Sequence, residues 1–358
     1  MPLQLSEEFY IRTSDQLLVQ PEPQYLYAQL MLGALGISLT PPDQLGLAGR
    51  EVGGVGANYT AADADRLRLS NPMFTDVIAA KVDFNGQPGS TININRPLFA
   101  NTTYTESSRR IGVGSTISTT PIKMAGQQTQ LTLFNYGGPY DQDNSRVAPY
   151  AINAFDANMG VHNQVRIFGT QTVRDFHKFC DAVYVSLLDL AATAVYPEGM
   201  SAVNDATATG SFPFTYEQLT RTENLMDTAN LPTFPDGFRA IVLTPTQVNH
   251  LRRDEEYQRA SQFFPQYSIL FPQYVASVNK FHIFKSTTLS TTANSSSIAI
   301  QYGHAIAPGA LLSGMGRRPR VTPNTNDNYG ETILAIWLAD LAFGLSNNTF
   351  VYSVRSSA

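Results

Sequence analysis

The chain has 358 residues, a formal net charge of −5 and only 15% charged residues. This length allows two or more packed units with a sizeable core. Because gripping phosphate requires a concentrated basic surface, the charge argues against a protein whose main task is nucleic-acid binding. A surface poor in charge and rich in Tyr, Phe, Gln and Asn is typical of large interfaces, but a plain uncharged polar surface accounts equally well for the composition.

Neither a disulfide nor a membrane segment is expected. The only cysteine, Cys180, has no partner within the chain and lies on the apolar face of a predicted helix, so we expect it in the core. The N-terminal stretch is acidic and interrupted by polar residues, which does not match a signal peptide. No stretch reaches the roughly 18 apolar residues of a membrane span.

Residues 1–73 are predicted to form an N-terminal arm. One plausible helix spans residues 24–35, and it is followed by Pro41-Pro42 and the glycine-rich stretch GREVGGVGANYT. Glycines permit an extended, flexible path, and the leucines of this region are too few for an independent core. We therefore expect the arm to bury its apolar residues against another part of the fold or against another subunit.

Residues 74–135 are predicted to form an extended loop. Two alternating segments, DVIAAKVDF and TININRPLF, flank the turn signals Asn85-Gly86 and Pro88-Gly89. The economical prediction is that these two segments pair as a hairpin. The polar stretch ANTTYTESSRRIGVGSTIST follows, and because it lacks apolar residues that would hold it against a core, we expect it to project.

Residues 136–214 are centred on a long predicted helix, residues 171–196, preceded by a shorter helical stretch at 150–168. Thr172 is the expected N-cap of the long helix, and Pro197 is expected to end it. Apolar residues recur at three- and four-residue steps, which is typical of one helix face. They are Val173, Phe176, Phe179, Cys180, Val183, Tyr184, Leu187, Leu188 and Ala191.

Residues 215–315 are predicted to form an α/β layer. A Thr-x-x-Gln capping box at Thr215 opens one helix, and Thr244 followed by Pro245 opens another. Between them, residues 238–243 form an apolar, β-branched run that indicates a buried strand. KFHIFKS and SSSIAIQYG add further strands, and HAIAPGALLSGM is predicted to be a short apolar connection.

The C-terminal residues 316–358 give conflicting signals. In ETILAIWLADLAFGL, the apolar residues fit a helical period. The Asn347-Asn348 turn and the alternating FVYSV segment that follows it indicate a hairpin of two strands instead. Spacing alone favours the helix.

The sequence predicts no catalytic residue, no cofactor-binding site and no metal site. It contains no G-x-x-x-x-G-K-[ST], H-E-x-x-H, G-x-S-x-G or C-x-x-C motif. Its five histidines are scattered, and none are paired at the spacing of metal ligands within a helix. Residues 141–145 resemble the start of a calcium loop but lack the later Gly and Glu, so an ordinary acidic turn is favoured.

Two arginine clusters are candidate contacts between subunits. Arg109 and Arg110 lie in the stretch that is expected to project, and Arg317, Arg318 and Arg320 lie near a turn. Clustered guanidinium groups can pair with carboxylates across an interface or lie near phosphates. For Arg109 and Arg110 we favour a partner subunit, while a role in solubility alone stays open.

The order of these parts resembles the major capsid proteins of tailed double-stranded DNA phages, which have the Hong Kong 97 fold. GSTININRP, YGGPY…APYAINAFDANM and DFHKFCDAV are similar to the passage from loop to long helix in podovirus-type coat proteins. FRAIVLTPTQVNHLRRDEEY is similar to their axial domain, and RPRVTPNTNDNYGETILAIWLADLAFGL…FVYSVRS is similar to their ending. The similarity covers nearly the whole chain.

The resemblance implies an α+β fold with five parts. They are an N-terminal arm (1–73), an extended β-hairpin loop or E-loop (74–135), a peripheral domain with a long spine helix (136–214), an axial α/β domain (215–315), and C-terminal strands that return to the peripheral domain (316–358). The resemblance favours strands over a helix in the last part. It also implies that the E-loop lies over a neighbouring subunit.

The resemblance also implies a function. Such proteins assemble as pentamers and hexamers into an icosahedral shell that encloses double-stranded DNA without sequence-specific binding. Scaffolding and portal proteins are the expected partners, no membrane is involved, and the protein is expected in the virion after assembly in the host cytoplasm. Some members crosslink the loop through lysine and asparagine, but only Lys81 and Lys123 lie near its base here, so we expect no crosslinks. An encapsulin-like compartment shell and a soluble enzyme or sugar-binding module are the alternatives.

Overall fold

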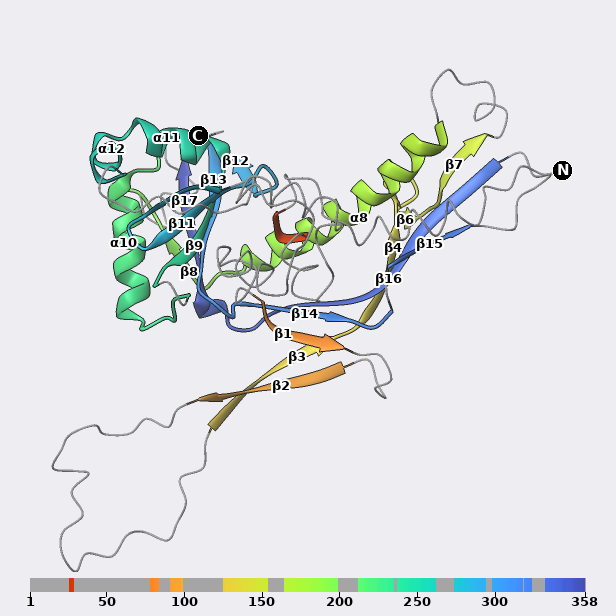
Figure 1. Cartoon of the computed structure of the whole chain (residues 1–358), viewed down its shortest axis with the longest axis horizontal. Helices are drawn as coiled ribbons and strands as arrows, with labels where there is room; N and C mark the ends of the chain where they lie inside the picture. Colours follow the sequence, from red (N-terminus) through yellow and green to blue (C-terminus); the bar gives the residue numbers. More distant parts are fainter. Residues whose placement is uncertain are drawn as a thin grey trace, which may run out of the picture.

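The fold combines two β-sheets, one long helix and a projecting ribbon (Figure 1). The computed structural model describes residues 26–28, 78–83, 91–98, 125–153, 164–198, 212–234, 237–261, 274–293, 298–317, 319–323 and 332–357. An α/β unit lies at one end, and a long helix and a long strand run side by side from it toward the other end (Figure 1). The α+β class expected from the sequence is confirmed.

The long helix, α8, spans Gln164–Leu188. It begins seven residues before the predicted start at residue 171, so Thr172 is buried within the helix and is not its N-cap. It also ends well before Pro197, because Thr193–Val195 form strand β8, which pairs in parallel with a C-terminal strand. Residues 193–195, which the helical spacing assigned to the helix, therefore form a strand because they pair with a distant strand.

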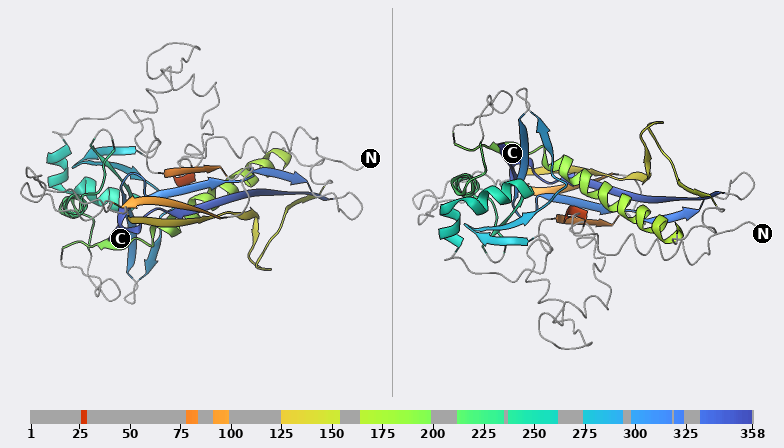
Figure 2. Two further views of the ribbon diagram at one scale, coloured as in Figure 1. Left: turned by 90° about the horizontal axis from the view of Figure 1, so that it is seen from below. Right: turned by 90° about the horizontal axis from the view of Figure 1, so that it is seen from above.

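A six-stranded sheet lies against α8. Its members are β1 (Ile78–Asp83), β4 (Phe134–Gly138), β7 (Tyr150–Asn153), β14 (Leu311–Met315), β15 (Arg320–Pro323) and β16 (Thr332–Leu345). β16 pairs with β14 and β15 along one edge and with β4 and β7 along the other. In Figure 2, α8 lies in front of these strands in the view from above and behind them in the view from below, so it covers one face of the sheet.

β16 is a strand, as the resemblance implied, and the helix that spacing alone favoured is not formed. Trp337, Ala339 and Leu341 are buried while Leu338 and Asp340, which lie between them, are only partly buried, so the period is two. Four partner strands satisfy the backbone of β16, which outweighs the coincidental helical spacing. The same pairing makes residues 150–153 a strand and not the start of the predicted shorter helix.

The predicted hairpin between the first two strands is also wrong. β1 pairs in parallel with β14, far along the chain, and β2 (Thr91–Leu98) pairs with β3 (Ala125–Thr132). A local turn signal carries no information about a distant partner, and β14 offers a sheet edge to β1. β14 lies within HAIAPGALLSGM, so part of this predicted connection is a strand. The polar stretch between β2 and β3 lies outside the described residues.

The α/β unit is built on a seven-stranded sheet whose order is β10-β11-β9-β13-β17-β8, with β12 paired to β13. Its other strands are β9 (Arg239–Leu243), β10 (Tyr274–Val278), β11 (Phe281–Lys285), β12 (Thr291–Ala293), β13 (Ala299–Ile306) and β17 (Val351–Ser357). The predicted buried strand at 238–243 is confirmed, since every residue of β9 is buried. The predicted strands in KFHIFKS and SSSIAIQYG are β11 and β13.

Three helices complete this unit: α10 (Tyr216–Thr228), α11 (Pro245–Arg253) and α12 (Glu255–Ser261). Both predicted N-caps are present. Thr244 and Gln247 form a complete capping box, whereas Gln218 donates its side chain to the Val195 and Arg355 carbonyls and leaves the box at Thr215 half formed.

The two C-terminal strands lie in different sheets, which corrects the predicted C-terminal hairpin. β16 belongs to the six-stranded sheet, whereas β17 pairs with β13 and β8 in the α/β unit. A short 3₁₀ helix, Asn348–Phe350, connects them. The chain end therefore ties the α/β unit to the elongated part of the molecule.

Candidate functional site

Of the predicted interface arginines, the structure describes Arg317 and Arg320, and their surroundings differ. Arg317 forms an ion pair with Asp340 of β16 (3.1 Å), and Asn135 of β4 donates to the same carboxylate oxygen (2.7 Å). Arg320 lies exposed on β15. Arg109, Arg110 and Arg318 lie outside the described residues. Arg317 therefore contacts its own subunit and Arg320 is exposed, and a role for either in contacts between subunits stays a prediction.

The contact between α8 and the six-stranded sheet is centred on Trp337. Its indole N–H donates to Asp175 of α8 (2.7 Å), and its ring packs edge-on against Phe176 (centroids 5.1 Å apart). Burial raises the pKa of Asp175, although the Trp337 hydrogen bond and Lys178 oppose this shift. A Cβ on Gly138 would lie 2.6 Å from both the Asp175 carboxylate and the indole, so only glycine fits there.

The base of the β2–β3 ribbon is fixed to the body by a small apolar cluster. Leu131 of β3 packs with Leu312 of β14 and Ala342 of β16, and all three are buried. The Thr129 hydroxyl donates to the Ser346 carbonyl (3.1 Å). Beyond this base, β2 and β3 pair only with each other among the described residues, and the ribbon projects away from the body (Figure 1).

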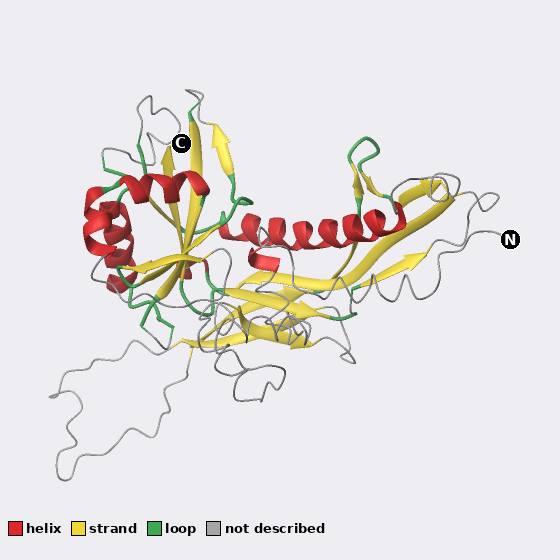
Figure 3. Ribbon diagram, turned by 45° about the horizontal axis from the view of Figure 1, so that its top comes forward, coloured by secondary structure: helices red, strands yellow, loops and turns green. Residues whose placement is uncertain are grey.

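A second projection is the short hairpin of β5 (Tyr140–Asp141) and β6 (Arg146–Val147), which extends beyond α8 in Figure 3. Its turn is the acidic segment that partly resembles a calcium loop. Asp141 accepts hydrogen bonds from the Asp143 and Asn144 backbones and from the Asn144 side chain, which lowers its pKa. Tyr140 and Val147 pair across the hairpin and are 59% and 47% exposed, so the hairpin presents apolar groups to its surroundings.

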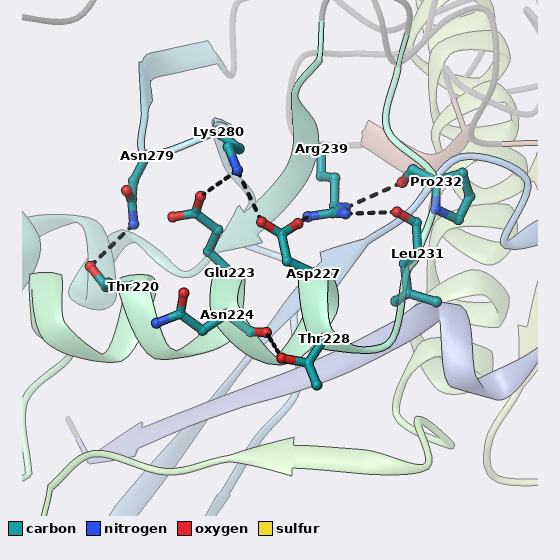
Figure 4. A network of polar contacts seen from close by, with 10 residues as sticks. All are labelled: Thr220, Glu223, Asn224, Asp227, Thr228, Leu231, Pro232, Arg239, Asn279 and Lys280. Atoms are coloured by element: carbon teal, nitrogen blue, oxygen red, sulfur yellow. Dashed lines mark hydrogen bonds and ion pairs between the residues drawn. The ribbon is translucent and has the colours of Figure 1, made fainter. Parts of the chain in front are cut away.

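The α/β unit carries a network of paired charges between α10 and the β10–β11 turn (Figure 4). Asp227 accepts from Arg239 (2.6 Å) and Lys280 (2.9 Å), which together lower its pKa, and Glu223 pairs with Lys280 (3.2 Å). Asn279 and Lys280 have φ values of 52° and 55°, which costs energy in residues other than glycine. The network holds this turn in a fixed shape.

Asp181 on α8 and Asp189 directly after its last residue join the helix to the α/β unit. Asp181 accepts the hydroxyl of Thr288, and Asp189 accepts the hydroxyl of Ser290 (2.5 Å) and contacts His304 Nε2 (2.9 Å). Burial alone would raise the pKa of Asp189, but the hydrogen bonds from His304 and Ser290 outweigh it and lower the pKa. Sequence reasoning missed these positions, although acidic residues within an apolar helix were a visible signal.

The Ser, His and Asp side chains near this junction do not form a nucleophilic triad. Asp189 lies between Ser290 and His304, so the imidazole does not accept the serine proton as a triad requires. Ser277 contacts His282 (2.5 Å), but Ser277 is only 5% exposed and His282 is fully buried. The described residues hold no group of metal-ligating side chains and no helix long and apolar enough to cross a bilayer.

Comparison with known proteins identifies the fold. No family model and no curated protein matches the sequence. The fold does match solved phage shells. The cyanophage Pam1 capsid aligns with a TM-score of 0.57 at 12% identity, covering 79% of this chain and 90% of that one. The chain has the fold of phage capsid proteins.

Two further structures agree on this capsid fold. The capsid of cyanophage P-SCSP1u matches with a TM-score of 0.54 at 12% identity, covering 78% of this chain and 86% of that one. The capsid of Ralstonia phage GP4 matches with a TM-score of 0.53 at 10% identity, covering 79% and 87%. The resemblance inferred from the order of parts is thus confirmed at the level of the fold, at identities too low for sequence matching.

Proposed function

We propose that this chain is the major capsid protein of a tailed double-stranded DNA phage and has a non-enzymatic, structural role. The observation that carries the proposal is the match to phage capsids over more than three quarters of the chain. The chain assembles as pentamers and hexamers of the Hong Kong 97 type into an icosahedral shell. Scaffolding and portal proteins are its proposed partners, and the virion is its proposed location.

The projecting ribbon supports assembly. An isolated two-stranded ribbon is marginal in water, and its outer edges carry backbone groups that invite pairing. β2 and β3 are fixed at their base but project from the body (Figure 1). A neighbouring copy of the chain that covers the ribbon supplies the missing contacts. We therefore assign the β2–β3 ribbon, within residues 74–135, to the E-loop and place the ribbon on an adjacent subunit, whereas β1 and β4 stay in the six-stranded sheet of their own subunit.

The remaining parts take the corresponding roles. The α/β unit forms the axial domain at the capsomer centre, and α8 with the six-stranded sheet forms the spine and peripheral domain. A net charge of −5 allows DNA to be enclosed without adhering to the inner wall. The compartment-shell alternative is less favoured, because the matching structures described above are phage capsids.

Negative-stain electron microscopy with size-exclusion light scattering tests the proposal. The chain is expressed alone and with its genomic neighbours. We expect closed icosahedral particles, or rings of five and six copies. A strictly monomeric species under all conditions would contradict shell assembly and would favour an enzyme or binding module.

The E-loop assignment has its own test. Deleting residues 101–115 should leave a folded monomer but abolish shells, whereas unchanged particles would show that the loop makes no essential contact. Changing Arg109 and Arg110 together to alanine should reduce particle yield. Arg252 and Arg253, an exposed pair at the end of α11, provide the matched control, since their double replacement by alanine should leave the yield unchanged.

A further inference from the structure

Asp181 binds the backbone of residues 26–28, the described part of the N-terminal segment. Residues 26–28 form a helical turn, and all three side chains are fully buried in the cluster that contains Tyr184 of α8. Asp181 Oδ1 accepts the backbone N–H groups of Tyr27 (2.7 Å) and Ala28 (3.4 Å). Its other oxygen accepts the Thr288 hydroxyl. Asp181 thus joins the N-terminal segment, the long helix and the α/β unit.

The charge of Asp181 has no described cation opposite it. The N-terminal segment contributes the Tyr27 hydroxyl, α8 contributes Cys180, and Asp189 lies directly after the end of α8. The α/β loop contributes the neutral hydroxyl of Thr288, and His304 of β13 is engaged with Asp189. Burial raises the pKa of Asp181 to about 6, even though three hydrogen bonds favour its ionised form.

We propose that Asp181 is a proton-controlled latch, which holds residues 26–28 firmly against α8 and the 286–290 loop when protonated and loosens them when ionised. Undocking the segment hydrates Asp181 and returns its pKa toward the ordinary value of 3.8. By linkage, docking is then about tenfold tighter at pH 5 than at pH 8. Acidity therefore governs how firmly residues 26–28 are held against their own subunit, whether or not the chain forms a shell.

Hydrogen exchange on the full-length chain tests the latch. Protection of the Tyr27 and Ala28 amides, corrected for intrinsic exchange at each pH, should be about tenfold higher at pH 5 than at pH 8. Asp181→Asn keeps an acceptor for these amides and can donate to the Thr288 oxygen, but it carries no charge, so its protection should be high and equal at both pH values. Glu217→Gln, which removes an exposed carboxylate of α10, should keep the wild-type response.

Two results would overturn the latch. One is equal protection of these amides at both pH values in the wild-type chain. The other is an unchanged pH response in Asp181→Asn, which would assign the response to another group. If Asp181→Asn does not fold, Thr288→Val decides the matter. It removes a donor that favours the ionised carboxylate, so the midpoint of the response should move to higher pH, and an unmoved midpoint contradicts the proposal.

Discussion

The α/β unit and the elongated part of the molecule are held together in different ways. The α/β unit has its own core, in which Leu219, Ile241 and Phe281 are fully buried, and its charged groups meet opposite charges, as in the Asp227 network. In the elongated part, α8 lies along β16, and the half-buried Asp175 and the buried Asp181 accept hydrogen bonds from neutral donors.

The two parts also differ in how far apart in the sequence their strands lie. Most of the α/β sheet comes from residues 239–306, whereas the six-stranded sheet gathers strands from residue 78 to residue 345. Burial raises the pKa of Asp175 and Asp181, while Arg239 and Lys280 lower the pKa of Asp227. The two regions should therefore respond differently to mutation and oppositely to pH.

Trp337→Ala should have the largest effect, and it should fall on the elongated part. The change removes a fully buried ring from the α8 contact and leaves Asp175 without its indole donor. We expect a loss of about 4–5 kcal/mol in the free energy of unfolding, measured by urea titration with far-UV circular dichroism. Peptide-resolved hydrogen exchange should show α8 and β16 losing protection while β9 and β13 keep theirs.

Trp337→Phe is the matched control, since it keeps most of the packing but removes the N–H donor. Its expected loss is about 1–3 kcal/mol. If Trp337→Ala instead lowers protection equally in both regions, the molecule unfolds as one cooperative unit and the proposed contrast fails.

Arg239→Met should weaken the α/β unit by about 3 kcal/mol. The guanidinium is almost fully buried and donates to Asp227 and to the Leu231 and Pro232 carbonyls, so its loss leaves buried acceptors unpaired. Urea unfolding measures the change. Lys280→Ala, which removes an exposed partner of the same carboxylate, should cost less than 1 kcal/mol. Equal losses would mean that the burial of Arg239 does not matter.

A pH titration sharpens the contrast. The pKa of Asp181 is raised to about 6, so its contribution to stability is fully present below pH 3.8 and is lost as the pH rises through 6. Between pH 5 and pH 8 this amounts to about 1–2 kcal/mol. The pKa of Asp227 is lowered, so its contribution is present above pH 3.8 and is lost as the pH falls below that value.

Asp181→Asn and Asp227→Asn should remove these two responses separately when urea unfolding is repeated across the pH range. A wild-type profile unchanged by Asp181→Asn would contradict the raised pKa.

Sequence reasoning succeeded where the deciding interactions are local. The caps at Thr215 and Thr244 and the strand at 238–243 depend on neighbouring residues, and all three are present. It failed where the partner is distant. β16 has helical spacing but is a strand because four other strands pair with it. β1 pairs with β14 and not with β2, the next strand in the sequence.

The candidate sites show the same limit. Arg317 pairs with Asp340 of its own subunit, a contact that spacing along the chain does not reveal, and its role between subunits stays a prediction. The role of Asp181 depends on three segments that are far apart in the sequence. Only the order of the parts carried the information that the fold comparison confirmed.

Tyr27→Phe should have the smallest effect and tests the packing at the latch. The Tyr27 hydroxyl is buried and has no partner among the described residues, so its removal should change stability by less than about 1 kcal/mol, toward stabilisation. Tyr184→Phe is the matched control in the same cluster, because its hydroxyl donates to the Leu312 carbonyl (3.3 Å) and its removal should destabilise by about 1 kcal/mol. Thermal unfolding of both variants at pH 5 measures the difference. If Tyr27→Phe costs as much as Tyr184→Phe, the Tyr27 hydroxyl is bound by a group outside the described part of the chain, and the N-terminal segment has a second anchor besides Asp181.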